Sequence, residues 1–142
     1  MKTIKELLAG KGQEIWSVKP TATVFEAIAL MAEKGVGALM VMDGEKPAGI
    51  ISERDYARKV ILQGRSSQAT PVQDIMTSRI IHTSPDRSVE ECMTLMTTNK
   101  IRHLPVMDAE RLVGVISIGD LVKATISEQQ STIEQLERYI NS

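Results

Sequence analysis

The chain lacks the features by which several common classes of protein are recognised. Its 142 residues carry 17 basic and 18 acidic side chains, for a formal net charge of -1, so it has no basic excess of the kind that nucleic-acid-binding proteins show. Aromatic residues make up only 3% of the chain, which is too few for a platform of stacked bases. Both deficits argue against a nucleic-acid partner.

Long apolar runs and paired cysteines are also missing. No run approaches the roughly 18 apolar residues that a membrane span needs, and the N-terminus lacks the apolar core and cleavage site of a signal peptide. We therefore expect a cytoplasmic protein with no membrane partner. Cys92 is the one cysteine and cannot form a disulfide within the chain. It falls on an apolar helical stripe, which predicts a buried small residue rather than a nucleophile.

Catalytic and metal-binding patterns are absent as well. The two histidines, His82 and His103, fall in separate predicted elements without a cysteine or carboxylate at metal-ligand spacing. Neither of the glycine-rich phosphate-binding loops, the P-loop and the dinucleotide fingerprint, is found. The sequence therefore predicts no enzyme activity, no metal and no catalytic cofactor.

What the chain does contain is a copy of itself. An offset of 65 residues lays Ile15 to Ile61 on Ile80 to Ile126 without a gap. Identical residues recur along it, among them prolines 20 and 85, glycines 49 and 114, serines 52 and 117, and aspartates 55 and 120. Such a repeat indicates two supersecondary units that cover each other, because one unit of about 50 residues would be marginal alone.

Each copy predicts the same order of elements. Extended pieces at 15–18 and 80–83 lead into a proline, and a helix follows behind the capping boxes Thr23-x-x-Glu26 and Ser88-x-x-Glu91. Two apolar runs form a hairpin, at 38–42 and 47–51 in one copy and at 104–107 and 112–116 in the other. A second helix begins after each repeated serine.

The predicted fold is therefore α/β (α+β), with two tandem β-α-β-β-α motifs related by a pseudo-twofold axis and a C-terminal helix. The segments are a lead-in at 1–14, the first motif at 15–62, a linker at 63–73, the second motif at 74–126 and a helical tail at 127–142. Thr3 to Ala9 predicts a short leading helix, and Val72 to Met76 its counterpart before the second copy.

The tail predicts a long helix from Leu121 to Ile140. Ile126, Ile133 and Ile140 lie seven residues apart, but two heptads are too few to establish a coiled coil. Two alternatives remain open, a helix that covers its own domain and a dimer contact.

Several phrases of the sequence together resemble the CBS domain. They are the duplicated β-α-β-β-α unit, Asp74-Ile75-Met76-Thr77 before the second copy, the run from Lys100 to Asp108, and Gly-x-x-Ser-x-x-Asp after the hairpin in both copies. A tandem pair of CBS domains is a Bateman module, and the resemblance covers nearly the whole chain. It implies a regulatory module without catalysis that binds AMP, ADP, ATP, NAD(H) or S-adenosylmethionine in a cleft between the copies.

The repeated serine and aspartate are the first candidate ligand residues. Ser52 with Asp55, and Ser117 with Asp120, stand where a strand passes into a helix, whose N-terminus favours a phosphate. An ionised aspartate accepts hydrogen bonds and suits the two hydroxyls of a ribose. The alternative is an ordinary N-cap pair that needs no ligand.

The resemblance also implies basic residues that reach the phosphates, and here the copies differ. Arg102 and His103 begin a hairpin strand of the second copy, whereas the first copy has Gly37 and Ala38 at these positions. Arg54 partly compensates in the first copy. We therefore expect two sites of different affinity.

The adenine ring needs an apolar slot. In the family, the first strand of one copy completes the pocket of the other, and a residue of the later strand packs on the opposite face of the base. The residues implied are Ile15 and Trp16 with Val115 at the Asp120 site, and Ile80 and Ile81 with Ile50 at the Asp55 site.

The sequence thus predicts a sensor of adenine nucleotides that changes shape and is read by an unidentified regulated protein. Family analogy favours a homodimer. The main alternative is a dimerising scaffold that acts through its C-terminal helix and has vestigial pockets. A fragment of a metabolic enzyme is a third possibility, which the absence of a catalytic domain disfavours.

Overall fold

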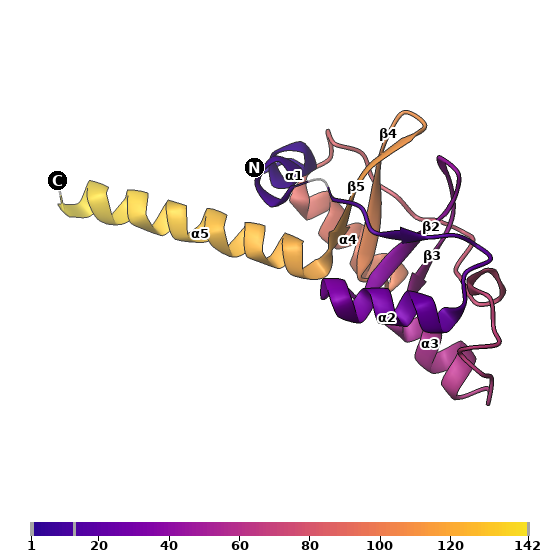
Figure 1. Cartoon of the computed structure of the whole chain (residues 1–142). Coiled ribbons are helices and arrows are strands. Elements are labelled where there is room, and N and C mark those ends of the chain that lie inside the picture. The colour runs from indigo at the N-terminus through magenta and orange to yellow at the C-terminus, as the bar shows by residue number, and fades with distance from the viewer. Residues whose placement is uncertain (1, 13, 142) are drawn as a thin grey trace. The chain divides into compact units, whose positions relative to one another are not determined.

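The computed structural model describes residues 2–12 and 14–141, and it confirms the mixed fold with two repeated motifs (Figure 1). The first motif contains β1, α2, the β2–β3 hairpin and α3, and the second contains α4, the β4–β5 hairpin and α5. The elements in chain order are α1 (Ile4–Lys11), β1 (Ser17–Val18), α2 (Val24–Lys34), β2 (Ala38–Asp43), β3 (Lys46–Ser52), α3 (Glu53–Tyr56), a π-helical turn η1 (Ala57–Ile61), a 3-10 turn η2 (Val72–Asp74), α4 (Val89–Asn99), β4 (His103–Asp108), β5 (Arg111–Ser117) and α5 (Ile118–Asn141).

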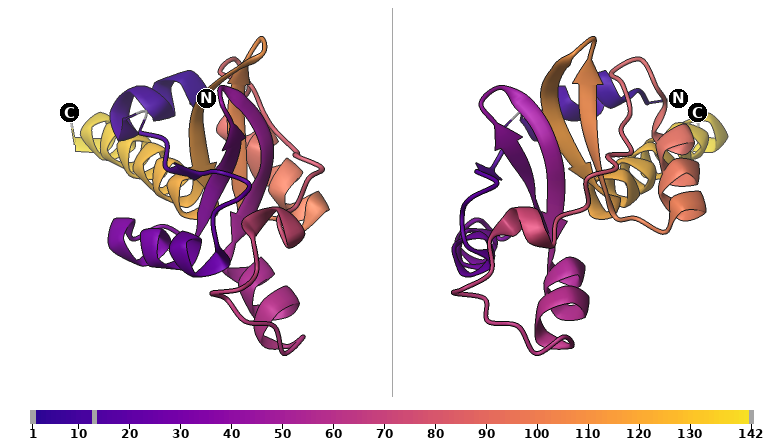
Figure 2. Two further views of the ribbon diagram at one scale, coloured as in Figure 1. Left: turned by 45° about the vertical axis from the view of Figure 1, so that its right-hand side comes forward. Right: turned by 90° about the vertical axis from the view of Figure 1, so that its right-hand side faces the viewer.

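The chain divides into two compact units whose boundaries differ from those of the sequence repeat. The first-copy unit is residues 14–81, and the second-copy unit is residues 1–13 together with 82–142. Helix α1, which precedes the first copy in the sequence, is therefore part of the second-copy unit. There it lies against the β4–β5 hairpin (Figure 2).

Backbone hydrogen bonds hold each lead-in segment to the start of a helix. In the second-copy unit, Ile4 N donates to the carbonyl of Arg87 at 2.9 Å, just before α4. In the first-copy unit, Val72 N donates to the carbonyl of Ala22 at 2.7 Å, just before α2. Each lead-in segment is thus bound to the copy that it does not directly precede.

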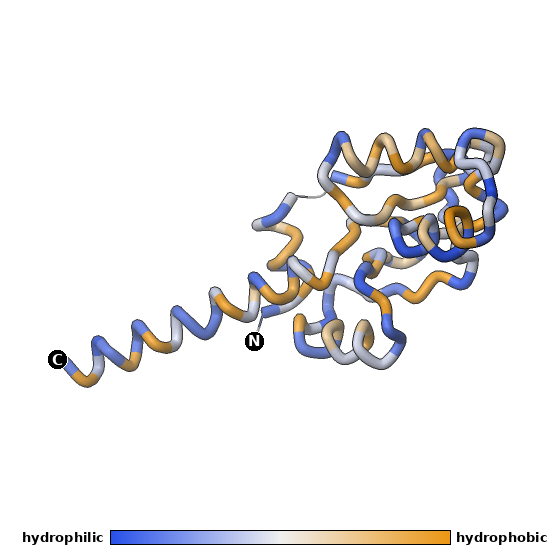
Figure 3. Tube along the Cα trace, turned by 90° about the horizontal axis from the view of Figure 1, so that it is seen from below, coloured by the Kyte–Doolittle hydropathy of each residue, from blue (hydrophilic) through white to orange (hydrophobic). Residues whose placement is uncertain are grey.

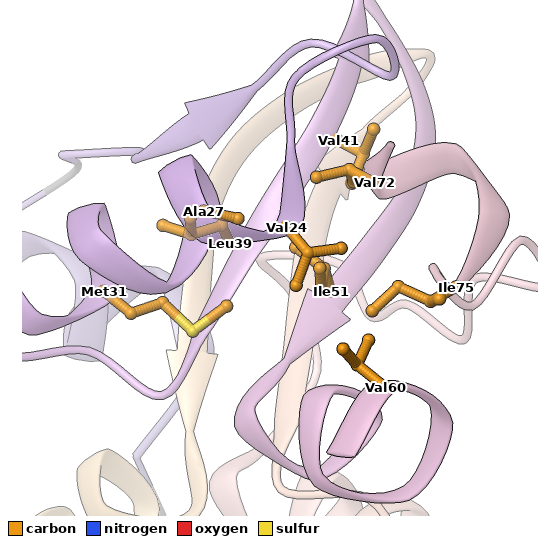
Figure 4. Close-up of a cluster of buried hydrophobic side chains, with 9 residues drawn as sticks. All are labelled: Val24, Ala27, Met31, Leu39, Val41, Ile51, Val60, Val72 and Ile75. Carbon is orange, nitrogen blue, oxygen red and sulfur yellow. The ribbon is translucent and has the colours of Figure 1, made fainter. Parts of the chain in front are cut away.

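The sheet of the first-copy unit has the order β1-β2-β3, with β1 parallel to β2 and β2 antiparallel to β3. Its hairpin turns at Gly44, whose φ of 65° is the left-handed conformation that glycine adopts readily. One face of α2 and both long strands bury their apolar side chains together with residues of the following turns (Figure 4). These buried residues are Val24, Ala27, Met31, Leu39, Val41, Ile51, Val60, Val72 and Ile75.

The extended piece predicted at 80–83 pairs with the hairpin through a single bridge, so it is shorter than β1 of the first copy. Thr83 pairs with Val106 in the same register in which Val18 pairs with Val41 in the first copy. The pairing stops at Pro105, which has no N–H to donate. Its counterpart, Met40, donates its N–H to the carbonyl of Trp16 at 3.2 Å and so extends β1.

Local capping largely follows the sequence. Ser88 and Glu91 form the full reciprocal capping box of α4, whereas at α2 the Thr23 side chain accepts from Glu26 N without the returning bond. Cys92 is 1% exposed on the inner face of α4, and burial raises the pKa of its thiol, as expected for a core residue.

The second helices of the copies differ most. In the first copy a short α3 passes directly into the π-helical turn, while in the second copy α5 runs unbroken for 24 residues. The long tail helix is confirmed: Leu121 and Ala124 at its start are buried, and every described residue from 126 onward is exposed. No helix within residues 2–12 and 14–141 has the length and apolarity needed to cross a bilayer.

Candidate functional site

In the first-copy unit, Ser52 and Asp55 form the N-terminal cap of α3. Ser52 N donates to Asp55 Oδ2 at 3.0 Å, and Asp55 N donates back to Ser52 Oγ at 3.2 Å. The pair therefore satisfies two backbone donors by itself. The same capping geometry holds the carboxylate at the start of the helix.

Lys59 is an unpredicted partner of Asp55. Its Nζ lies 3.1 Å from Asp55 Oδ1, one helical turn away, and donates to the carbonyl of Ile75 at 2.9 Å. The hydroxyl of Thr77 also donates to Asp55 Oδ1, at 3.4 Å. The Asp55 carboxylate is only 13% exposed. Its Oδ2 accepts from the helix cap, and its Oδ1 lies beside the Lys59 ammonium group.

The second-copy unit repeats the cap at Ser117 and Asp120. Ser117 N donates to Asp120 Oδ2 at 2.8 Å, and Asp120 N donates to Ser117 Oγ at 3.2 Å. The ammonium here comes from α1, since Lys11 Nζ donates to Asp120 Oδ2 at 2.6 Å and to the carbonyl of Val115 at 2.7 Å. A lysine thus bridges the aspartate and a backbone carbonyl in both units.

Burial together with neighbouring charges shifts the pKa values of two groups at the Asp120 site. Burial raises the pKa of Asp120, but the hydrogen bonds from Lys11 and Ser117 and the charge of Lys11 outweigh it and leave that pKa below its ordinary value. Burial lowers the pKa of His103 below its ordinary value of 6.5, while the negative charge of Asp120 opposes this shift. The second-copy unit thus brings together Lys11, His103 and Asp120.

The predicted phosphate-binding positions lie at the starts of the same helices. The carbonyl of Arg102 accepts a hydrogen bond from Ile118 N at 2.8 Å, and that of Gly37 accepts one from Glu53 N at 3.0 Å. The side chains of Arg102 and Arg54 are exposed. Both copies therefore have the hydrogen bond between the residue before the hairpin and the start of the helix. Only the second copy has a cationic side chain at that residue, Arg102, where the first copy has Gly37.

The predicted adenine-binding residues occupy varied positions. Ile50 pairs with Thr77 through two backbone hydrogen bonds of 3.0 and 2.9 Å, and Ala38 is 8% exposed at the start of β2. Ile80 and Ile81 lie in an irregular segment beyond Thr77. The role of these residues at the Asp55 site stays a prediction.

Trp16 has a structural partner in its own unit. Lys34 Nζ lies 4.4 Å from the centroid of the indole ring, and the ring packs against the core of the first-copy unit. Ile15 and Trp16 belong to this unit and Asp120 to the other, so their predicted meeting at one ligand stays a prediction.

Two glycines let the lead-in segments approach the hairpins closely. A Cβ at Gly49 would stand 2.7 Å from Met76 Sδ and 2.9 Å from the carbonyl oxygen of Thr77. A Cβ at Gly114 would stand 2.8 Å from Leu8 Cδ2. This close approach positions Thr77 beside Asp55 and α1 beside Asp120.

The sequence analysis missed both lysines. Lys59 stands four residues after Asp55, a spacing at which helical side chains meet, and this signal could have found it. Lys11 lies outside the repeat and 109 positions from Asp120, and no sequence pattern connects them.

A hollow of about 500 Å³ also lies in the second-copy unit, but it contains none of the predicted ligand residues. Within residues 2–12 and 14–141 no group of three or more His, Cys, Asp or Glu side chains could hold a metal ion. The hollow is lined by His82, Thr83, Ser84, Arg87, Glu91, Leu95, Met107 and Ala109.

The sequence matches a known protein family. The family model described as "CBS domain" matches twice, at residues 12–61 and 72–127. The protein "CBS domain-containing protein CBSX3, mitochondrial" of Arabidopsis thaliana is 42% identical over 148 residues, which cover 97% of this chain and 71% of the relative.

Solved structures show the same fold. A protein with CBS domains from Burkholderia ambifaria is 52% identical, with a TM-score of 0.87 over 90% of this chain and 96% of that chain. The CBS domain pair of protein MJ0100, in complex with 5'-methylthioadenosine and S-adenosyl-L-methionine, has a TM-score of 0.80. It is 22% identical and matches 90% of this chain and 98% of that chain, so it bears on the fold alone.

Proposed function

The chain belongs to the CBS domain family, and from this membership we propose that it is a regulatory module that binds an adenosine-containing ligand through Asp55 and Asp120. Ligand binding shifts the population of module shapes, and a partner protein reads that shift. The shift is no larger than the difference in ligand affinity between the two shapes.

The observation that carries the proposal is the matched carboxylate at the start of two helices. Asp55 and Asp120 are each held by a reciprocal cap, so their oxygens are positioned before any ligand arrives. Preorganised acceptors lose little conformational freedom on binding and suit the paired hydroxyls of a ribose. Nearby backbone N–H groups and the positive end of the helix suit a phosphate.

Lys59 and Lys11 define the state that the ligand must change. Each ammonium donates to the aspartate and to a carbonyl, which are the kinds of acceptor that ribose hydroxyls use. Ribose binding therefore displaces the lysine from the carboxylate. The released ammonium then lies near the ligand and attracts a phosphate group.

We propose the ligand class from this chemistry, and a structural relative gives an example of it. The MJ0100 domain pair is bound to two adenosine derivatives, 5'-methylthioadenosine and S-adenosyl-L-methionine. For this chain the candidates are AMP, ADP, ATP, NAD(H) and S-adenosylmethionine. Because Arg102 and His103 lie beside the Asp120 site, we propose that this site takes the more highly phosphorylated ligand.

The assembly and cellular place complete the proposal. We propose a homodimer that acts on a regulated protein, and the cytoplasm as its location. The exposed apolar stripe of α5 favours a second candidate function, a dimerising scaffold whose ligand sites are vestigial.

Titration calorimetry of the whole chain with AMP, ATP, NAD and S-adenosylmethionine tests ligand binding. We expect at least one to bind, and Asp120→Ala to weaken that binding roughly tenfold to a hundredfold, since an uncompensated hydrogen-bond partner is lost. Asp108→Ala, at an exposed carboxylate at the end of β4, is the matched control and should bind as the wild type does.

If the chain is a dimerising scaffold, a different outcome is expected. Calorimetry should detect no binding of any of the four ligands, and removing the residues after Ile126 should abolish self-association. Equal ligand affinity of Asp120→Ala and the wild type would contradict the role given to this carboxylate.

A further inference from the structure

The C-terminal half of α5 is an exposed amphipathic helix. Leu121 and Ala124 are its only buried residues within the described part, and the helix extends beyond the other elements of its unit (Figure 1). Apolar residues recur along the extension at helical spacing (Figure 3). The exposed stripe consists of Val122 at 40%, Ile126 at 50%, Ile133 at 53%, Leu136 at 56% and Ile140 at 76%.

Such a helix needs a partner. An isolated helix of about 15 residues is marginal in water, and most helices in proteins are stabilised by packing of an apolar face. No described residue of the chain covers the stripe, since residues 126–141 are all exposed. A contiguous apolar stripe rimmed by polar residues marks an interaction surface.

The spacing of the stripe is that of a two-helix contact. One row is Ile126, Ile133 and Ile140, and the other is Val122, Gln129 and Leu136, each with a period of seven residues. The first row is all isoleucine, and the second has Val122 and Leu136 on either side of one polar residue, so both rows supply apolar side chains to the contact. The positions on the opposite face of the helix are polar, so the helix has one apolar seam.

We propose that a second copy of this chain covers the stripe and that the two α5 helices run antiparallel. In this register Ile126 packs against Leu136 of the partner subunit, and Val122 packs against Ile140 of the partner subunit. Each helix then buries the whole seam of the other. The inference does not depend on ligand binding.

The charges beside the seam favour the antiparallel direction. Lys123 and Glu137 occupy the same flank of the seam, and neither forms an ion pair with another described residue. The antiparallel register brings Lys123 next to Glu137 of the partner subunit, twice in each dimer. In a parallel pair each residue is level with its own copy, so these opposite charges stay about 20 Å apart along the axis.

The length of the helix agrees with this register. The register centres on Ser131, so Asn141 is level with Leu121 of the partner subunit, which is one of the two buried residues at the start of α5. The overlap of about 30 Å therefore includes the whole exposed segment 126–141. A membrane surface is a poorer occupant, because residues 122–141 carry two basic and three acidic side chains, whereas membrane-surface helices are rich in lysine and arginine.

Charge reversal tests the register in the full-length protein. Lys123→Glu and Glu137→Lys each place like charges together, so each should weaken self-association roughly tenfold in sedimentation equilibrium. The double variant restores the attraction and should associate within about twofold of the wild type. Arg138→Glu, on the outer face of the same helix, is the control. Single variants that behave like this control, or a double variant that is not rescued, would overturn the proposal.

Engineered cysteines give a second test that a second dimer interface cannot imitate. Ile126→Cys with Leu136→Cys should form a disulfide-linked dimer under mild oxidation, since the two positions lie about 15 Å apart within one helix and cannot bridge there. The native Cys92 is buried. Each single variant should remain unlinked. Rapid linking of Ile126→Cys alone would indicate parallel helices, and no linking of the double variant would indicate no pairing; either result refutes the antiparallel contact.

Discussion

The Asp55 and Asp120 sites have the same cap but receive their ammonium group from different places. Lys59 comes from the turn that follows α3, whereas Lys11 comes from α1 at the other end of the chain. At the offset of the repeat, Lys59 corresponds to Ala124, so the second copy has no equivalent lysine. The two copies therefore share the backbone scaffold of the site, whereas each unit takes its countercharge from a different part of the chain.

The lead-in segments explain the difference. Met76 and Thr77 lie against β3 in the first-copy unit, and α1 lies against β5 in the second-copy unit. Gly49 and Gly114 stand at equivalent positions of the two hairpins, and each leaves room for the lead-in segment because it has no Cβ. The first lead-in supplies the hydroxyl of Thr77 to its aspartate, and the second supplies the ammonium of Lys11.

The largest difference between the units should appear when these glycines are replaced by alanine. Gly49→Ala places its Cβ 2.9 Å from the carbonyl oxygen of Thr77, a backbone atom held by hydrogen bonds to β3. We expect a loss of about 2–3 kcal/mol in the free energy of unfolding, measured with urea. Gly114→Ala meets only the end of the Leu8 side chain and should cost about 1 kcal/mol. Equal losses would show that the two lead-ins are held equally firmly.

Removing each ammonium tests which aspartate binds ribose. Lys11→Met leaves Asp120 without its cation, so adenosine should bind up to about tenfold tighter if its hydroxyls replace that ammonium, as calorimetry would reveal. Lys59→Met should have a smaller effect, because the Lys59 contact is longer, at 3.1 Å against 2.6 Å. Weaker adenosine binding in Lys11→Met would show instead that the lysine contributes to the site.

The smallest effect concerns the pH dependence of stability. Because the pKa of His103 is lowered from 6.5 in the folded protein, the unfolded chain binds this proton first as the pH falls. The free energy of unfolding should therefore decline below pH 6.5 and level off below the folded pKa, with a slope of at most about 1.4 kcal/mol per pH unit. His103→Gln should remove this part of the decline in urea titrations at pH 7 and pH 5. The first copy has Ala38 at this position and contributes no such effect.

Much of the fold could be predicted because local signals agree with the tertiary structure. The repeat at 65 residues, the serine caps and the apolar spacing of the helices are properties of neighbouring residues, and they predicted the order of elements. The extended piece at 80–83 forms only one bridge, because continued pairing depends on a donor across the sheet, which Pro105 lacks. For the apolar stripe of the C-terminal helix, the sequence left two alternatives open, a cover for its own domain and a dimer contact. The spacing of apolar residues shows that a helix is amphipathic but not what covers its apolar face.

The amino-acid sequence by itself determined the duplicated motif and the two caps that hold Asp55 and Asp120 at helix starts. The motif is read from the repeat at 65 residues, and the caps follow from contacts between residues three positions apart. Only the tertiary structure decided that α1 joins the second-copy unit and brings Lys11 to Asp120. That contact joins residues 109 positions apart, and it forms because Gly114 leaves room for Leu8 and because backbone hydrogen bonds hold α1 to the start of α4.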